Sequence, residues 1–341
     1  MSTSSRNQHP DPAACAGPPN TGPSSDEDRA ARVALTWLAE PGNHTVWSLV
    51  QQHGAPATLQ QLVRGDLPET ALTESVRAKT VLVDPRRMAA EALHQAQRLG
   101  VRVVVPADDE WPTQIDALAT LELDAPGRVT QNVRPPLCLW VRGAWPLRET
   151  LDRSVAVVGA RAATPYGTTV TTDIAYGLAE RGWTVASGGA YGIDAAAHQA
   201  TLAAGGRTVA VLACGLDRPY PAGNAALFER IAETGLLISE WPPGAEPLRH
   251  RFLARNRLVA AVTAGTVVVE AVVRSGSVQM MSPVLALGRV AMVVPGPVTS
   301  AMSVGCHELL RTHPQAKLVT GVPHILQALD CGGDTNEPQP W

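Results

Sequence analysis

The chain has 341 residues and 45% of them are hydrophobic, which is enough for two or three domains at roughly 100–200 residues each. Lys and Arg number 28 against 31 Asp and Glu, a net charge of −3, so the chain is no polycation and nucleic-acid affinity would need a local basic patch. The five cysteines form no C-x-x-C pair, and no apolar leader or membrane-length stretch is present, so we expect a soluble, cytoplasmic protein without disulfides, metal or cofactor.

The N-terminal third divides into a tail and a helical segment. Residues 1–28 are rich in Ser, Pro, Asn and Asp and predict a disordered tail. Residues 29–100 predict a small all-helical domain, with apolar patterns typical of helices at Val33–Leu38, Val46–Val50, Leu59–Val63 and Ala89–Leu99. The sequence gives this bundle no chemistry of its own.

Residues 101–320 predict one α/β domain. Strands are expected at Val101–Val105, Leu137–Val141, Val155–Val158, Thr184–Ser187, Thr208–Ala213, Leu236–Ser239, Thr266–Val269 and Val290–Val294. From Ser154 onward the strands alternate with helices, which indicates a doubly wound, mostly parallel sheet with right-handed crossovers. Residues 321–341 should add only a short helix, at His324–Leu329, and a flexible tail.

The centre of this domain, Val155–Asp194, reads as strand, glycine turn, helix, strand, glycine turn, helix. Two such turns place two helix N-termini at one carboxyl edge of the sheet, where helix dipoles and free N–H groups favour a phosphate. The alternative is that the glycines only permit tight turns. The candidate phosphate-binding residues here are Gly159, Arg161, Ser187, Gly188, Gly189 and Gly192.

A second signal is a local excess of positive charge. Five arginines lie between Arg249 and Arg274, against Glu246 and Glu270. We expect a helix over Leu258–Val262, with Arg255, Asn256 and Arg257 just before it. Arginines at a helix N-terminus oppose its dipole, so their presence predicts a bound anion. A solvated face or salt bridges at the helix start would also explain them.

Several other polar residues admit a structural interpretation. Asp194 and His198 lie four residues apart, but without a G-x-S-x-G elbow we interpret Asp194 as a helix cap and not as part of a catalytic triad with Ser187. Tyr220 and Trp241 follow predicted strands and either stack on a base or pack their loops.

Ordered motifs across about half the chain resemble the DNA-processing protein A family. They are V-V-G-A-R at 157–161, S-G-G-A-Y-G-I-D-A-A-A-H at 187–198, C-G-L-D at 214–217, S-E-W-P-P-G at 239–244, R-N-R at 255–257, E-A with R-S-G-S at 270–277, and V-P-G at 294–296. The resemblance implies an extended Rossmann-like fold after a sterile-alpha-motif-like (SAM-like) helical domain, and no enzyme activity. It also implies single-stranded DNA binding, loading of the RecA recombinase during natural transformation, and a homodimer.

The same resemblance adds Arg274, Ser275, Gly276 and Ser277 to the expected DNA-binding residues. No C-terminal winged-helix domain, which many members carry, is expected in the printed sequence. The turn after Ser277 departs from the family pattern, and Pro283 predicts a helix that starts near Ser282 or is kinked there.

Two alternatives share this fold. One is a phosphoribohydrolase of the related nucleotide-binding superfamily, but its catalytic glutamate would fall at Met280, which has no proton to exchange. The other is a nucleotide sensor that uses the pocket without chemistry. A G-x-x-x-x-G-K-[ST] motif is absent, so we do not expect an ATPase.

Overall fold

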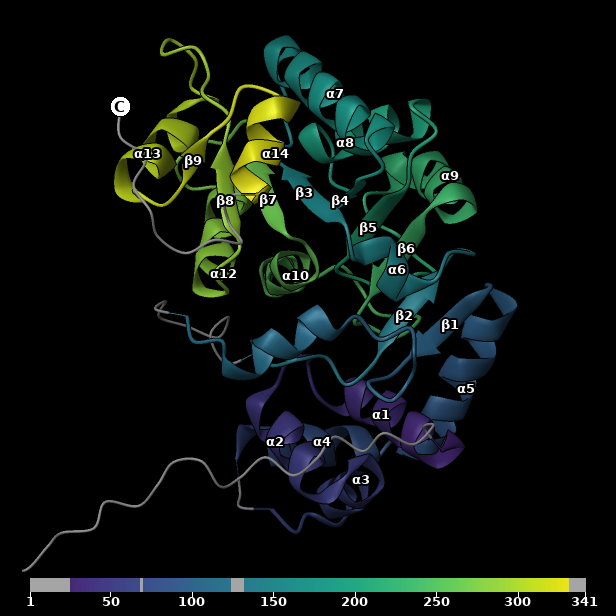
Figure 1. Ribbon diagram of the computed structural model, residues 1–341. Helices are drawn as coiled ribbons and strands as arrows, with labels where there is room; N and C mark the ends of the chain where they lie inside the picture. The colour runs from purple at the N-terminus through teal and green to yellow at the C-terminus, as the bar shows by residue number, and fades with distance from the viewer. Residues whose placement is uncertain (1–24, 68–69, 124–131, 331–341) are drawn as a thin grey trace, which may run out of the picture.

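The computed structural model describes residues 25–67, 70–123 and 132–330 (Figure 1). The expected tails at 1–24 and 331–341 lie outside these residues. None of the helices in the described ranges combines the length and the apolar character that crossing a membrane requires.

A helical bundle forms the N-terminal part, drawn in purple and blue in Figure 1. Its helices are α1 (Asp26–Leu38), α2 (His44–His53), α3 (Ala55–Arg64), α4 (Ala71–Thr80) and α5 (Pro85–Arg98). Helix α1 begins within the tail predicted for residues 1–28, because Ser25 caps it and three acidic residues in its first turn complement the helix dipole. The sequence analysis missed α4, which buries only Thr73 and Val76 and so has a weak apolar pattern.

A nine-stranded sheet organises the rest of the chain, in the order β1-β2-β6-β5-β4-β3-β7-β8-β9. Its strands are β1 (Val101–Val104), β2 (Leu139–Arg142), β3 (Ser154–Val158), β4 (Thr184–Ser187), β5 (Thr208–Leu212), β6 (Leu236–Ser239), β7 (Gly265–Val268), β8 (Val290–Val293) and β9 (Lys317–Leu318). The pairs β1–β2 and β2–β6 are antiparallel, and β3 to β9 form a parallel sheet. The predicted doubly wound, mostly parallel sheet is confirmed.

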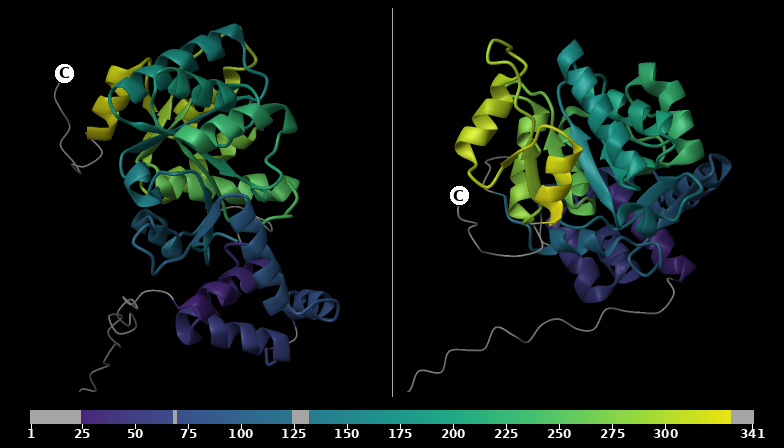
Figure 2. Two further views of the ribbon diagram at one scale, coloured as in Figure 1. Left: turned by 90° about the vertical axis from the view of Figure 1, so that its right-hand side faces the viewer. Right: turned by 45° about the horizontal axis from the view of Figure 1, so that its top comes forward.

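Helices cover both faces of the sheet (Figures 1 and 2). They are α6 (Leu147–Leu151), α7 (Pro165–Glu180), α8 (Ile193–Ala203), α9 (Ala225–Thr234), α10 (Arg249–Val262), α11 (Gly276–Gln279), α12 (Met281–Ala286), α13 (Val304–Thr312) and α14 (Val322–Asp330), with 3-10 turns η1 (Thr113–Thr120) and η3 (Ala222–Asn224). Strand β3 shows the alternation. Val155 and Val157 pack with α7 and α14, whereas Ala156 and Val158 pack with α10 and α12. Residues buried on both faces explain the unbroken apolar run in the sequence.

Two local predictions have definite outcomes. Helix α10 begins at Arg249, nine residues before the predicted start, so Arg255 and Arg257 lie inside the helix and not at its N-terminus. The predicted break near Pro283 is confirmed: α11 ends at Gln279 and α12 begins at Met281. Proline has no N–H to donate to the residue four before it, which accounts for the interruption.

Candidate nucleic-acid interface

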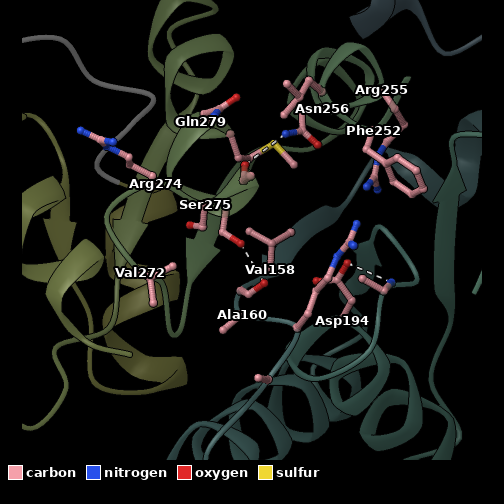
Figure 3. Close-up of a pocket in the computed structure, with 18 of the residues that line it drawn as sticks. Val158, Ala160, Asp194, Phe252, Arg255, Asn256, Val272, Arg274, Ser275 and Gln279 are labelled. Atoms are coloured by element: carbon pink, nitrogen blue, oxygen red, sulfur yellow. Dashed lines mark hydrogen bonds between the residues drawn. The ribbon is translucent and has the colours of Figure 1, made fainter. Parts of the chain in front are cut away.

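A cleft of about 790 Å³ opens at the carboxyl edge of the parallel strands. Its walls come from the turn after β3, the loop after β4, the pocket-facing side of α10, and the 272–280 segment that leads into α11. Figure 3 shows Phe252 and Arg255 on one side of this cleft and Arg274 on the other. The cleft therefore lies where open α/β sheets bind their ligands.

The rim of the cleft is positively charged. Arg161, Arg249 and Arg274 all line the cleft and are exposed. Within the described part of the chain, none of the three has an ion-pair partner. Asp194 is the one carboxylate among the described lining residues. A locally basic cleft in a chain of net charge −3 is the electrostatic pattern of a polyanion site.

Arg255 lies deeper, at the floor of the cleft. It is 6% exposed, and its Nη1 donates to the carbonyl of Val211 at 2.9 Å. Its guanidinium packs directly against Gly188, so that a Cβ on residue 188 would overlap it. Burial lowers the pKa of Arg255 and raises that of Asp194, and the attraction between these two groups opposes both shifts. Arg255 therefore makes the floor positive without being free to follow a ligand.

A carboxylate of this chain lies beside each of the two helix N-termini predicted to bind phosphate. At α8, Asp194 accepts a hydrogen bond from the N–H of Ala190 at 3.2 Å. At α7, Glu270 accepts from the N–H of Thr164 at 2.9 Å and from its hydroxyl at 2.6 Å, and Thr164 caps the helix. These carboxylates would repel an external phosphate, whereas the exposed arginines on the rim would attract one. Phosphate binding at the N-termini of α7 and α8 stays a prediction.

Arg257 is a structural residue in this structure. Its Nη1 and Nη2 bind Glu240 at 2.6 and 3.0 Å, and its Nε donates to the carbonyl of Asn132 at 2.9 Å. Both side chains are buried, at 2% exposed for Arg257 and 0% for Glu240, and neither lines the cleft. The dipole argument that placed Arg257 at the site failed because α10 starts earlier than its apolar pattern indicates.

The structure brings the Ser-Gly-Ser turn at 275–277 next to the first glycine turn. The Ser277 hydroxyl donates to the carbonyl of Gly159 at 2.8 Å, and the Asn256 amide donates to the carbonyl of Gly276 at 3.2 Å. Ser275 caps α11 through the N–H of Val278. Five residues of these segments line the cleft: Gly159, Asn256, Ser275, Gly276 and Ser277. The hydrogen bonds among them therefore fix the shape of the cleft.

The remaining predicted residues of the second glycine turn are placed behind the cleft. Ser187 is fully buried and donates to the carbonyl of Val157 at 2.7 Å. Gly189 packs against Phe228, and Gly192 against the backbone of Ala160 and Arg161; neither glycine lines the cleft. These residues shape the turn and do not present groups to a ligand.

Asp194 and His198 are not arranged for nucleophilic catalysis. His198 is fully buried, its Nδ1 lies 2.7 Å from the Thr208 hydroxyl, and burial lowers its pKa to about 3. Asp194 binds the N–H of Ala190 in the glycine loop. Gly192 is the N-cap of α8 and no side chain caps this helix, so the helix cap predicted for Asp194 is wrong. The described residues also contain no group of three or more His, Cys, Asp or Glu side chains that could hold a metal ion.

Among the lining residues that the sequence analysis did not predict as site residues are the charged Arg249 and the aromatic Phe252. Together with Asn256 they follow an i, i+3, i+7 spacing on one face of α10. The Arg161 guanidinium lies 5.3 Å from the Phe252 ring centroid, and Tyr220, 43% exposed, meets the same ring edge-on at 5.8 Å. Trp241, left open in the sequence analysis, is 1% exposed and therefore packs its loop.

Together, these observations define an extended Rossmann-like α/β protein with a basic, aromatic-edged cleft at the carboxyl edge of its sheet. Residues 102–330 match the family described as DNA recombination-mediator protein A. The chain belongs to this family of DNA-processing proteins.

Sequence similarity to individual proteins supports this assignment. The chain is similar to the putative DNA processing protein DprA of Mycobacterium tuberculosis, with 45% identity over 317 residues, 92% of this chain and 79% of that protein. It is also similar to Protein Smf of Escherichia coli, with 35% identity over 288 residues, 84% of this chain and 70% of that protein.

Two solved structures resemble the fold. DNA processing protein A from Streptococcus pneumoniae matches with a TM-score of 0.71 and 27% identity, over 89% of this chain and 98% of that one. DNA processing protein A from Helicobacter pylori, whose structure describes a single-stranded DNA binding mode, matches with a TM-score of 0.56 and 28% identity, over 67% of this chain and 95% of that one.

Proposed function

We propose that this protein binds single-stranded DNA in the cleft, with Arg161, Arg249 and Arg274 contacting successive phosphates. The observation that carries the proposal is that these three exposed arginines surround one cleft and lack an ion-pair partner within the described ranges. Guanidinium groups bind phosphate through paired hydrogen bonds without reading the base, so recognition should be independent of sequence. The binding mode reported for the H. pylori relative supports the same ligand.

The aromatic side of the cleft favours an unpaired strand over a duplex. Tyr220 and Phe252 lie edge-on to one another at the rim, beside the Arg161 guanidinium. A base can stack on an aromatic ring only when its own faces are free, and such stacking contributes about 1–3 kcal/mol per base. In a duplex the bases are already stacked and lie inside the helix.

An enzymatic role in nucleotide cleavage has less support. Met280 lines the cleft at the position of the hydrolases' glutamate and is 3% exposed. Asp194, the one carboxylate among the described lining residues, is buried against Arg255 and the Ala190 N–H. Glycosidic cleavage ordinarily uses two carboxyl groups flanking the bond.

We further propose that the bound strand is handed to RecA, that this serves natural transformation, and that the protein acts as a cytoplasmic homodimer. Membership of the recombination-mediator family supports these roles. A cleft that holds the backbone through a few arginines leaves the strand extended and reachable by a second protein. RecA nucleation on a single strand should be faster when the protein is added. The measurement is the rate of DNA-dependent ATP hydrolysis by RecA.

Fluorescence anisotropy with a labelled oligothymidine, its duplex and AMP as competitor tests the central proposal. We expect the single strand to bind more tightly than the duplex, AMP to compete poorly, and no free adenine to form. The logarithm of affinity should fall by about 2 per tenfold rise in salt, since three phosphates contribute about 0.7 each. A flat salt response, or AMP binding as well as the oligonucleotide, would favour the nucleotide sensor instead.

A further inference from the structure

Helix α10 supplies one wall of the cleft but lacks the features that normally stabilise a helix start. Leu248 precedes it without a side-chain cap, and its first turn has no acidic residue. The first turn holds Arg249, His250 and Arg251 instead, at the positive end of the helix dipole. An isolated helix of this sequence would fray at the end that carries Arg249 and Phe252.

The missing negative charge comes from the helical bundle. Glu40, which follows α1, binds Arg251 through two hydrogen bonds, at 2.6 Å to Nη2 and 3.1 Å to Nε. It also accepts from Trp241 Nε1 at 2.9 Å and lies 3.9 Å from His250. Burial alone would raise the pKa of Glu40, but Arg251 and Trp241 hold it below its usual value, so Glu40 is charged.

The next residues of the same turn contact α10 a second time. Gly42 has a φ of +79° and lies against the Arg257 guanidinium and the Asn132 carbonyl, with no room for a Cβ. Its own carbonyl accepts from the N–H of Arg134 at 3.1 Å, and Asn43 pairs with Asn132 as a β-bridge. The segment 40–43, which we call the α1–α2 turn, therefore contacts α10 at both Arg251 and Arg257.

Neither contact point on α10 lines the cleft. The α10 residues that line it are 249, 252, 253, 255 and 256, and Arg251 is about 200° around the helix from Arg249 at 100° per residue. We infer that Glu40 is a positioning residue: the α1–α2 turn of the helical bundle holds α10 so that Arg249 and Phe252 face the bound strand. This inference rests on the proposed single-strand binding, and it gives the helical bundle a role in the site.

The Glu40→Gln variant separates positioning from simple electrostatics, because the two predict opposite changes in affinity for single-stranded DNA. Removing a negative charge near a DNA site should by itself raise affinity. Loss of positioning should lower it, and we expect a 3–10-fold weaker oligothymidine complex. Asp108→Asn is the matched control: Asp108 pairs with Arg29 of α1 at 2.8 Å, outside α10 and the cleft, and should leave affinity unchanged or slightly higher.

Two further measurements isolate the route through Arg251. In an Arg251→Ala background, Glu40→Gln should weaken binding no further, and Glu40→Asp, which keeps the charge, should lose less than Glu40→Gln. Hydrogen exchange of the DNA-free protein should show amides 253–256 exchanging at least fivefold faster in Glu40→Gln than in the wild type.

The outcomes are distinguishable from failure of the proposed function. If the wild type does not bind oligothymidine, the proposed function fails, and hydrogen exchange alone still reports whether Glu40 holds α10. Unchanged exchange overturns the inference, as does unchanged or increased affinity of Glu40→Gln in a wild type that binds. Weaker binding together with faster exchange supports it.

Discussion

Replacing Arg161 by alanine should separate binding from folding. Arg161 is exposed, follows β3 directly, and contacts Phe252 through a cation–π interaction at 5.3 Å. An exposed interaction of this kind contributes about 0.5–1 kcal/mol, so the free energy of unfolding should change by no more than that. A hydrogen bond to a phosphate is worth about 1.5–3 kcal/mol, which corresponds to roughly a 10- to 100-fold loss of affinity for a single strand.

The assay is an anisotropy titration repeated at several salt concentrations. Losing one phosphate contact should reduce the slope of log affinity against log salt by about 0.7. Arg161→Lys should restore the slope but only part of the affinity, because an ammonium cannot make the paired contact. Arg87→Ala provides the control, since the Arg87 side chain is 75% exposed and pairs with Glu91 on α5, away from the cleft. Wild-type affinity for Arg161→Ala, or an unfolded protein, would refute the reasoning.

The other predictions concern groups behind the cleft. Arg257→Ala should lower the free energy of unfolding by about 3–5 kcal/mol, because it leaves Glu240 charged and buried. An unchanged melting temperature together with weaker DNA binding would show instead that Arg257 contacts DNA. Gly188→Ala should destabilise by about 1–3 kcal/mol and weaken binding, since its Cβ would displace Arg255, and an unchanged denaturation midpoint would contradict this. His198 has a folded pKa of about 3 against an unfolded value near 6.5, so it contributes stability above pH 6.5 that is lost as the pH falls toward 3. Between pH 6 and 5 the unfolding free energy of the wild type should therefore fall by about 1.2 kcal/mol more than that of His198→Gln, and parallel curves would refute the assignment.

Much of the sheet could be predicted from the sequence because its signals are local. Apolar runs such as Val155–Val158 indicate strands buried on both faces, and glycines such as Gly182, with a φ of +72°, end helices. Parallel strands also bring their carboxyl ends together, which predicts that the glycine turns after β3 and β4 lie at one edge, and residues of both turns, Arg161 and Ala190, line the cleft. Proline at 283 marked a helix break for equally local reasons.

Only the tertiary structure decides which arginines pair with carboxylates of the chain and which can bind a ligand. The sequence presents Arg251, Arg255 and Arg257 as similar members of one basic run, yet each is matched by a carboxylate distant in the chain: Glu40, Asp194 and Glu240. Whether a charge is free to bind a ligand depends on which groups surround it, and for these arginines that surrounding comes from segments up to 211 residues away. The same holds for the starts of α7 and α8, which sequence spacing assigned to phosphate and beside which Glu270 and Asp194 lie. Local pattern thus determined where the cleft would form, and long-range packing determined which of its arginines remain available.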